Sequence, residues 1–167
     1  MRSRQINLFQ QLNGDDMPIL NPIQNDNLMR LNIKGKGGKD RQLAEAMGHE
    51  RAHAEFHDAK DGDALYEYKK QSGCQWIDAF KLARLDEAPE GISILWFNHK
   101  DGVIQSVYSS TYEQVRDILF PTAIDRELLN MYRSIAANRT RKAADQVKCK
   151  IDVKEIKQNF TLLWERS

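Results

Sequence analysis

The chain has 167 residues, of which 41% are hydrophobic and 29% are charged, and its formal net charge is +1. This length and balance are those of one globular domain with a core of its own. No apolar run approaches the roughly 20 residues of a membrane helix, and the N-terminus lacks the apolar segment of a signal peptide. Cys74 and Cys149 lack metal-ligand spacing. We therefore expect reduced thiols and an intracellular, cytoplasmic protein that does not contact a membrane.

Apolar periodicity and turn signals predict the elements in chain order. The first part of the chain reads as a helix at 3–13, a loop at 14–27, a short strand or helical turn at 28–33, a basic loop at 34–39 and a helix at 39–52. The middle reads as a strand at 55–58, a turn at 61–63, a strand at 64–70, a helix at 76–85, a loop at 86–91 and strands at 92–97 and 103–109. The last part reads as a helix from 110 or 111 to Pro121, a helix at 125–136 and a helix capped by Asp152 that reaches 163.

No repeat, low-complexity tract or domain boundary interrupts this order. We therefore expect one α/β (α+β) domain over 1–167, with a mixed central β-sheet flanked by helices. Its parts are an N-terminal helix and loop at 1–27, a catalytic core at 39–120 and C-terminal basic helices at 125–167. Because duplex DNA has twofold symmetry, the N-terminal helix is the predicted dimerisation element.

Charge is distributed unevenly along the chain. Basic residues cluster before residue 42 and in the last quarter, whereas acidic residues concentrate between 58 and 90. An acidic centre between basic segments favours a protein that holds a metal ion and binds a polyanion, and solvated faces are the alternative interpretation. The candidate DNA contacts are Lys34, Lys36, Lys39, Lys70, Gln71, Ser72, Gln75, Arg139 and Arg141.

The middle of the chain reads as a β-hairpin with functional side chains. Two β-capable runs, 55–58 and 64–70, flank an Asp-Gly-Asp turn at 61–63, which is a hairpin signal. Side chains alternate along a strand, so Glu67 and Lys69 share one face, while Asp58 lies on the neighbouring strand. An Asp followed by Glu-x-Lys on a strand is how a metal-dependent phosphodiesterase holds a divalent cation beside a phosphate. A surface strand with opposite charges on one face is the alternative.

A magnesium site follows from this pattern. Mg²⁺ prefers one or two carboxylates together with water and phosphate oxygens. Asp58 and Glu67 supply the carboxylates, the Tyr68 carbonyl adds a third oxygen, and Lys69 contacts the phosphate and the attacking water. Asp63 is too close in sequence to Glu67 for both to reach one cation. The further carboxylates that could assist the metal, or lie exposed instead, are Glu45, Glu50 and Glu55.

The segment from Asp58-Ala59 to Tyr66-Glu67-Tyr68-Lys69 resembles the PD-(D/E)XK nuclease signature, with a compact spacing similar to that of small type II restriction endonucleases of the PvuII kind. A helix led by Gly37-Gly38-Lys39, and an apolar strand hairpin followed by a helix over 92–119, extend the resemblance in layout to about half of the chain. The sequence departs from the signature at His57, where the family has proline. Residues 71–78 stand where the PvuII kind has a His-rich recognition segment, so no target sequence carries over.

The resemblance implies a restriction-endonuclease-like fold and a Mg²⁺-dependent type II restriction endonuclease that acts as a homodimer. Such an enzyme hydrolyses double-stranded DNA at a short specific sequence and leaves 5′-phosphates. Asp58, Glu67 and Lys69 take the catalytic positions of the family. Two alternatives remain open: a structure-selective nuclease, such as a junction resolvase or repair nuclease, and a non-enzymatic DNA-binding protein in which Glu67 and Lys69 are a surface pair.

Overall fold

The structure, a computed structural model, describes residues 20–35, 37–137 and 147–167. Its strands are β1 (Glu50–Arg51), β2 (Ala59–Asp61), β3 (Ala64–Gln71), β4 (Gln75–Asp78), β5 (Ile92–Lys100), β6 (Val103–Thr111), β7 (Lys148–Ile151) and β8 (Thr161–Glu165). Its helices are α1 (Pro22–Arg30), α2 (Lys39–Met47), α3 (Ala79–Ala83), α4 (Tyr112–Leu119), α5 (Ala123–Ala137) and α6 (Val153–Asn159), with a 3₁₀ turn η1 at Leu85–Glu87. Among these described helices, none has the length and apolar character needed to cross a membrane.

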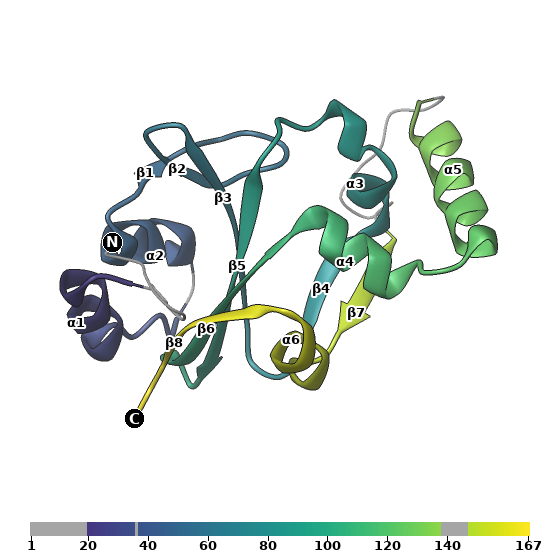
Figure 1. The fold of residues 1–167 in the computed structure, drawn as a ribbon. Helices are drawn as coiled ribbons and strands as arrows, with labels where there is room; N and C mark the ends of the chain where they lie inside the picture. The colour runs from purple at the N-terminus through teal and green to yellow at the C-terminus, as the bar shows by residue number, and fades with distance from the viewer. Residues whose placement is uncertain (1–19, 36, 138–146) are drawn as a thin grey trace, which may run out of the picture.

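In the described part of the chain, six strands form a mixed sheet in the order β1-β2-β3-β5-β6-β8, and β4 pairs with β7 in a separate small sheet. Strands β1, β2 and β3 are antiparallel neighbours, β3 and β5 run parallel, and β5, β6 and β8 are again antiparallel. Helices lie on both sides of the large sheet (Figure 1). The expected mixed α/β architecture, with a central mixed sheet flanked by helices, is confirmed.

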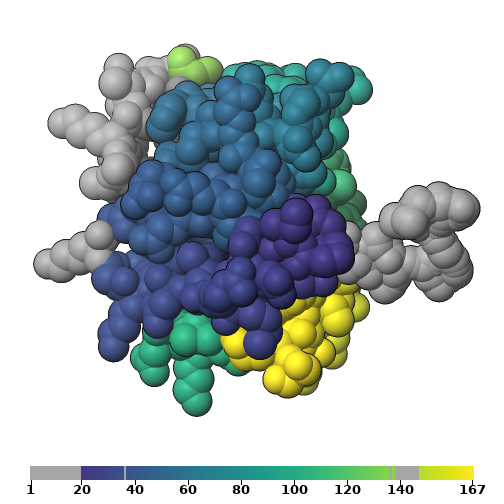
Figure 2. All heavy atoms as spheres, turned by 90° about the vertical axis from the view of Figure 1, so that its left-hand side faces the viewer, coloured from purple at the N-terminus to yellow at the C-terminus, as the bar shows by residue number. Residues whose placement is uncertain are grey.

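The two faces of the sheet bury different side chains of the same strands. Along β5, Ile94 and Trp96 pack into one core with residues of α3, α4 and α6. Leu95 and Phe97 point the other way, into a second core with residues of α1 and α2. Figure 2 shows the side of the molecule that α1 and α2 cover, in purple and blue. Because β5 is covered on both faces, its sequence is a continuous apolar run, as the prediction of a buried central strand required.

Tight turns connect β2 to β3 and β5 to β6, and the glycine in each turn explains its backbone conformation. The β2–β3 hairpin closes at Asp61 and Ala64, and Gly62 takes a φ of +61° as the first of the two turn residues. The β5–β6 turn consists of Asp101 and Gly102, with φ values of +51° and +85°. Positive φ at both central residues defines the hairpin turn that Asp-Gly favours. Both turns lie where the sequence predicts them.

Several predicted elements are wrong in type or extent. Residues 22–30 form helix α1, where the sequence predicts a loop up to 27 and a short strand or helical turn from 28, because Asn21 and Gln24 make a reciprocal capping box and Pro22 occupies the first turn. The helix predicted to reach 52 ends at Met47, since Gly48 takes the left-handed C-cap conformation with a φ of +74°. Residues 55–58 are bends and irregular chain that lead into β2, not a strand.

Two strands replace helix predictions. Residues 75–78 form β4, where Gln75 and Ile77 are buried and Trp76 is 38% exposed, so the period is two rather than 3.6. The last helix ends at Asn159, and the following residues 161–165 pair with β6 as strand β8. Phe160 lies between the helix and the strand, and its ring stacks on Trp96 in the core. The helix predicted at 3–13 lies outside the described residues.

Candidate active site

Asp58 is fixed against β3 at the point where β2 begins. Its backbone N–H donates to the Tyr66 carbonyl at 2.7 Å, and its carboxylate Oδ2 accepts from the Tyr68 N–H at 2.8 Å. The Asp58 carboxylate thus accepts from a β3 N–H in place of the backbone carbonyl of a paired strand. This contact holds the carboxylate beside Glu67, which lies between Tyr66 and Tyr68 on β3. The choice of Asp58 among the acidic residues of the hairpin therefore has a structural basis.

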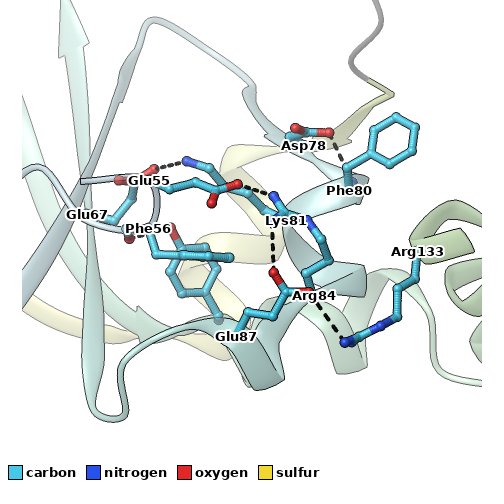
Figure 3. A network of polar contacts seen from close by, with 10 residues as sticks. Glu55, Phe56, Glu67, Asp78, Phe80, Lys81, Arg84, Glu87 and Arg133 are labelled. Atoms are coloured by element: carbon cyan, nitrogen blue, oxygen red, sulfur yellow. Dashed lines mark hydrogen bonds and ion pairs between the residues drawn. The ribbon is translucent and has the colours of Figure 1, made fainter. Parts of the chain in front are cut away.

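Glu67 is the centre of a compact charged cluster. Its side chain is 6% exposed, and its Oε2 lies 3.6 Å from Nζ of Lys69 on the same strand. Nζ of Lys81, from helix α3, lies 3.3 Å from the same oxygen (Figure 3). The carboxyl groups of Asp58 and Glu67 lie side by side, and this proximity raises the pKa of Glu67. The predicted triad of Asp58, Glu67 and Lys69 is brought together, with Lys81 as a fourth member.

Burial shifts the ionisation of this cluster. Loss of hydration raises the pKa of Glu67 from 4.5 to about 7, and the Lys81 and Lys69 ammonium groups lower it less than burial and the Asp58 carboxylate raise it. Burial also lowers the pKa of Lys69, an effect that the Glu67 carboxylate opposes. Perturbed ionisable groups of this kind gather where a protein performs acid–base or metal chemistry, although ion-pair networks produce them as well.

The oxygen atoms at this corner fit a hard divalent cation. In a strand, the N–H and C=O of one residue point to the same side, so the Tyr68 carbonyl is directed to the Asp58 side, as its N–H is. Two carboxylates in contact and one backbone carbonyl match the few protein ligands that Mg²⁺ takes besides water and phosphate. Within residues 20–35, 37–137 and 147–167, no group of three or more His, Cys, Asp or Glu side chains could hold a metal. A cation bound here would take its remaining ligands from water and substrate.

The chain that carries Asp58 is held by helices α3 and α4 (Figure 3). The Tyr112 hydroxyl at the start of α4 donates to the Phe56 carbonyl at 2.8 Å, and the two rings meet edge to face. Arg84, which follows α3, lies over the Phe56 ring and pairs with Glu55. Irregular chain at 55–58 is thus kept in one position by a buried hydrogen bond and an aromatic contact.

Lys81 and Tyr112 are site residues that the sequence did not identify. Lys81 lies in the predicted 76–85 helix, but nothing local indicates that its side chain crosses to β3. The signal for Tyr112 was stronger, because it opens helix α4 directly behind a capping box formed by Thr111 and Gln114. Its contact with Phe56 spans 56 positions of sequence and depends on the packing of α4 against the sheet.

Each of the three additional carboxylates pairs with a basic side chain. Glu45 pairs with Arg41 on the exposed face of α2. Glu50 lies 3.9 Å from Lys60 across the β1–β2 pair. Glu55 is held by Arg84. Glu45 and Glu50 are exposed, as the alternative interpretation has it, while a metal-assisting role for Glu55 stays a prediction.

The predicted DNA contacts fall into different environments. Lys70 points to the opposite face of β3 from Lys69 and pairs with Asp40 of α2. Together with Lys39 and Arg51 it lines a hollow of about 340 Å³ at the start of α2. Gln75 is fully buried, with its amide directed to the Phe97 carbonyl, so this position offers nothing to a DNA groove. The exposed positions are Lys34 and Ser72, Gln71 is half-buried at the end of β3, and Lys36, Arg139 and Arg141 lie outside the described residues.

No protein-family model matches the chain, and a comparison with curated proteins finds no similar sequence.

Proposed function

We propose that the chain is a divalent-metal-dependent nuclease that hydrolyses phosphodiester bonds of double-stranded DNA, as type II restriction endonucleases do. The observation that carries this proposal is the convergence of Asp58, Glu67 and Lys69 at the end of the β2–β3 hairpin away from its turn. The layout supports it as well, because the hairpin is followed by the parallel strand β5, the β5–β6 hairpin and helix α4. This is the order of elements on which the resemblance to PD-(D/E)XK nucleases rests.

Each residue has a defined task in this proposal. Asp58, Glu67 and the Tyr68 carbonyl would hold the cation, and contact between the two acids puts their oxygens within reach of one ion. A bound Mg²⁺ supplies Lewis-acid polarisation of the phosphate and favours ionisation of water. Lys69 projects from the same face of β3 and places a positive charge beside the phosphoryl oxygens, where negative charge develops during hydrolysis.

The reaction is a single displacement at phosphorus. The oxygen of a water molecule bonds to phosphorus while the bond from phosphorus to the 3′-oxygen breaks, and the 3′-oxygen takes up a proton. The products are a 5′-phosphate and a 3′-hydroxyl. The Lys69 ammonium would also donate a hydrogen bond to the attacking water and so orient it.

Recognition of a specific sequence by a homodimer is the finer part of the proposal. Gln71 ends β3 and Ser72 follows it, shortly after Lys69 in the chain, so both would lie near the reacting phosphate. The basic hollow with Lys39 and Lys70 lies on the other side of the same strand and offers positive charge to a DNA backbone. The N-terminal helix proposed to form the dimer lies outside the described residues.

The direct test is incubation of the purified protein with plasmid DNA and Mg²⁺ or Mn²⁺, beside a D58N variant. A restriction-type enzyme yields discrete fragments with 5′-phosphates, whereas activity on branched DNA alone identifies a structure-selective nuclease. Loss of cutting in D58N assigns the activity to this site. If the wild type cuts neither linear, supercoiled nor branched DNA with either cation, the nuclease proposal fails and a non-enzymatic DNA-binding role replaces it.

A further inference from the structure

Two ammonium groups compete for one oxygen of Glu67. Nζ of Lys69 lies 3.6 Å from Oε2, and Nζ of Lys81 lies 3.3 Å from the same atom. Lys69 comes from the strand that carries Glu67, so its position relative to the carboxylate is fixed by the strand. Lys81 comes from α3, and its side chain reaches across from the helix to the sheet (Figure 3). The carboxylate thus has one ammonium that belongs to its own strand and one that is brought by a neighbouring element.

Helix α3 is firmly placed, so this reach is a property of the fold. Asp78 caps the helix by accepting a hydrogen bond from the Phe80 N–H at 3.0 Å. Phe80 and Leu82, on either side of Lys81 in sequence, are buried. The backbone of Lys81 is therefore anchored, while the four-carbon side chain remains free to rotate. Its side chain is 22% exposed, against 6% for Glu67.

The charges of the cluster balance only while both lysines are present. When both carboxyl groups are ionised, as they must be to hold a divalent cation, Asp58 and Glu67 contribute two negative charges, and Lys69 and Lys81 contribute two positive charges. A divalent cation bound to the two carboxylates would leave a net charge of +2 in a largely buried site, which is unfavourable before a phosphate arrives. One ammonium must move away. The Lys69 and Lys81 side chains are similarly exposed, at 20% and 22%, but Lys81 comes from a neighbouring element, whereas Lys69 belongs to the strand that carries Glu67 and is the proposed phosphate contact.

We propose that Lys81 is the resident counter-ion of Glu67, that a divalent cation displaces its ammonium, and that the displaced ammonium then binds a phosphate of the incoming nucleic acid. This inference rests on the proposed function, because it assumes that Asp58 and Glu67 hold the cation. In the free protein, the Lys81 ammonium then opposes metal binding. In the metal-bound protein, it contacts a phosphate of the nucleic acid. A bound cation releases the Lys81 ammonium to the phosphate, and a bound phosphate keeps that ammonium away from the cation. Each ligand therefore strengthens the binding of the other.

The proposal predicts opposite effects of one substitution on two ligands. Removal of the ammonium in K81Q should strengthen Mn²⁺ binding in the absence of DNA by roughly tenfold, because the cation no longer has a competitor. The same variant should weaken binding of a short DNA duplex in the presence of Ca²⁺ by roughly three- to tenfold, because a phosphate contact is lost. A purely structural role would weaken both, and K81R, which keeps the charge, should restore both to within about twofold of the wild type.

The experiment titrates Mn²⁺ by electron paramagnetic resonance, without DNA, into wild type, K81Q, K81A, K81R and D58N. K154Q, which neutralises an exposed lysine on α6, is the matched control. Fluorescence anisotropy of a labelled duplex supplies the second readout. If D58N abolishes Mn²⁺ binding but K81Q and K81A leave it unchanged or weaker, the role of Lys81 is refuted and the proposed function stands. If neither the wild type nor the Lys81 variants bind Mn²⁺, both proposals are refuted.

Discussion

Replacement of Glu67 by glutamine should change the way in which stability depends on pH. The side chain is buried, and its pKa is raised from 4.5 to about 7. Between these values the folded protein keeps a proton that the unfolded chain has released. The folded state therefore binds more protons in this range, and the free energy of unfolding of the wild type falls as the pH rises. Glutamine has the same shape without the ionisation, so E67Q escapes this loss.

The size of the effect follows from the two pKa values. One pH unit corresponds to about 1.4 kcal/mol, so the whole interval amounts to about 3.4 kcal/mol. About 2.5 kcal/mol of this loss falls between pH 5 and pH 8. The free energy of unfolding of E67Q minus that of the wild type should therefore increase by about 2.5 kcal/mol over this range. Burial is the largest cause of the raised pKa, so added salt should reduce the effect little.

Urea denaturation at pH 5, 6, 7 and 8, with a chelator present, measures this difference. E90Q, which removes a carboxylate from an exposed loop, serves as the control and should follow the wild type at every pH. Parallel stability curves for the wild type and E67Q would refute the reasoning. They would mean that the two neighbouring ammonium groups keep Glu67 ionised in the folded protein at pH 5.

Two further substitutions test the packing around the site, both by urea denaturation. G102A should destabilise the fold by about 3 kcal/mol, because an added Cβ would lie 2.2 Å from Asn32 Oδ1 and the φ of +85° strains any side chain. G62A, at a positive φ but in open space, should cost only about 1 kcal/mol, and equal losses would contradict the steric argument. Y112F should cost about 1–2 kcal/mol because the buried Phe56 carbonyl loses its donor, and no change would show that water replaces the hydroxyl.

Local signals were sufficient to predict the hairpin and the central strand. Gly62 and the alternation along β3 determine the turn and the face on which Glu67 and Lys69 lie, whatever the rest of the chain does. The continuous apolar run around Trp96 could only be a buried strand or a buried helix, and its length decided for the strand. About ten residues of local sequence are therefore enough to predict each of these elements.

Elements that depend on distant partners were mispredicted. Strands β4 and β7 are separated by about 70 positions, so neither shows a hairpin signal, and the aromatic spacing at Trp76 resembled a helix. Strand β8 exists because it adds to the edge of β6, after Phe160 has packed on Trp96. Lys81 likewise could not be identified from local sequence, because its contact with Glu67 depends on how α3 packs beside the sheet.

In the proposed function, Lys69 acts on a phosphate held beside Asp58 and Glu67. Single-turnover cleavage of duplex DNA at saturating enzyme and Mg²⁺ tests it most directly, in wild type, K69M and K60M. The control Lys60 is an exposed lysine on β2 of the same hairpin. K69M should lower the rate of cleavage by roughly a hundredfold or more, while K60M should stay within about twofold of the wild type. Equal rates for K69M and the wild type would contradict the assignment of this hairpin as the active site.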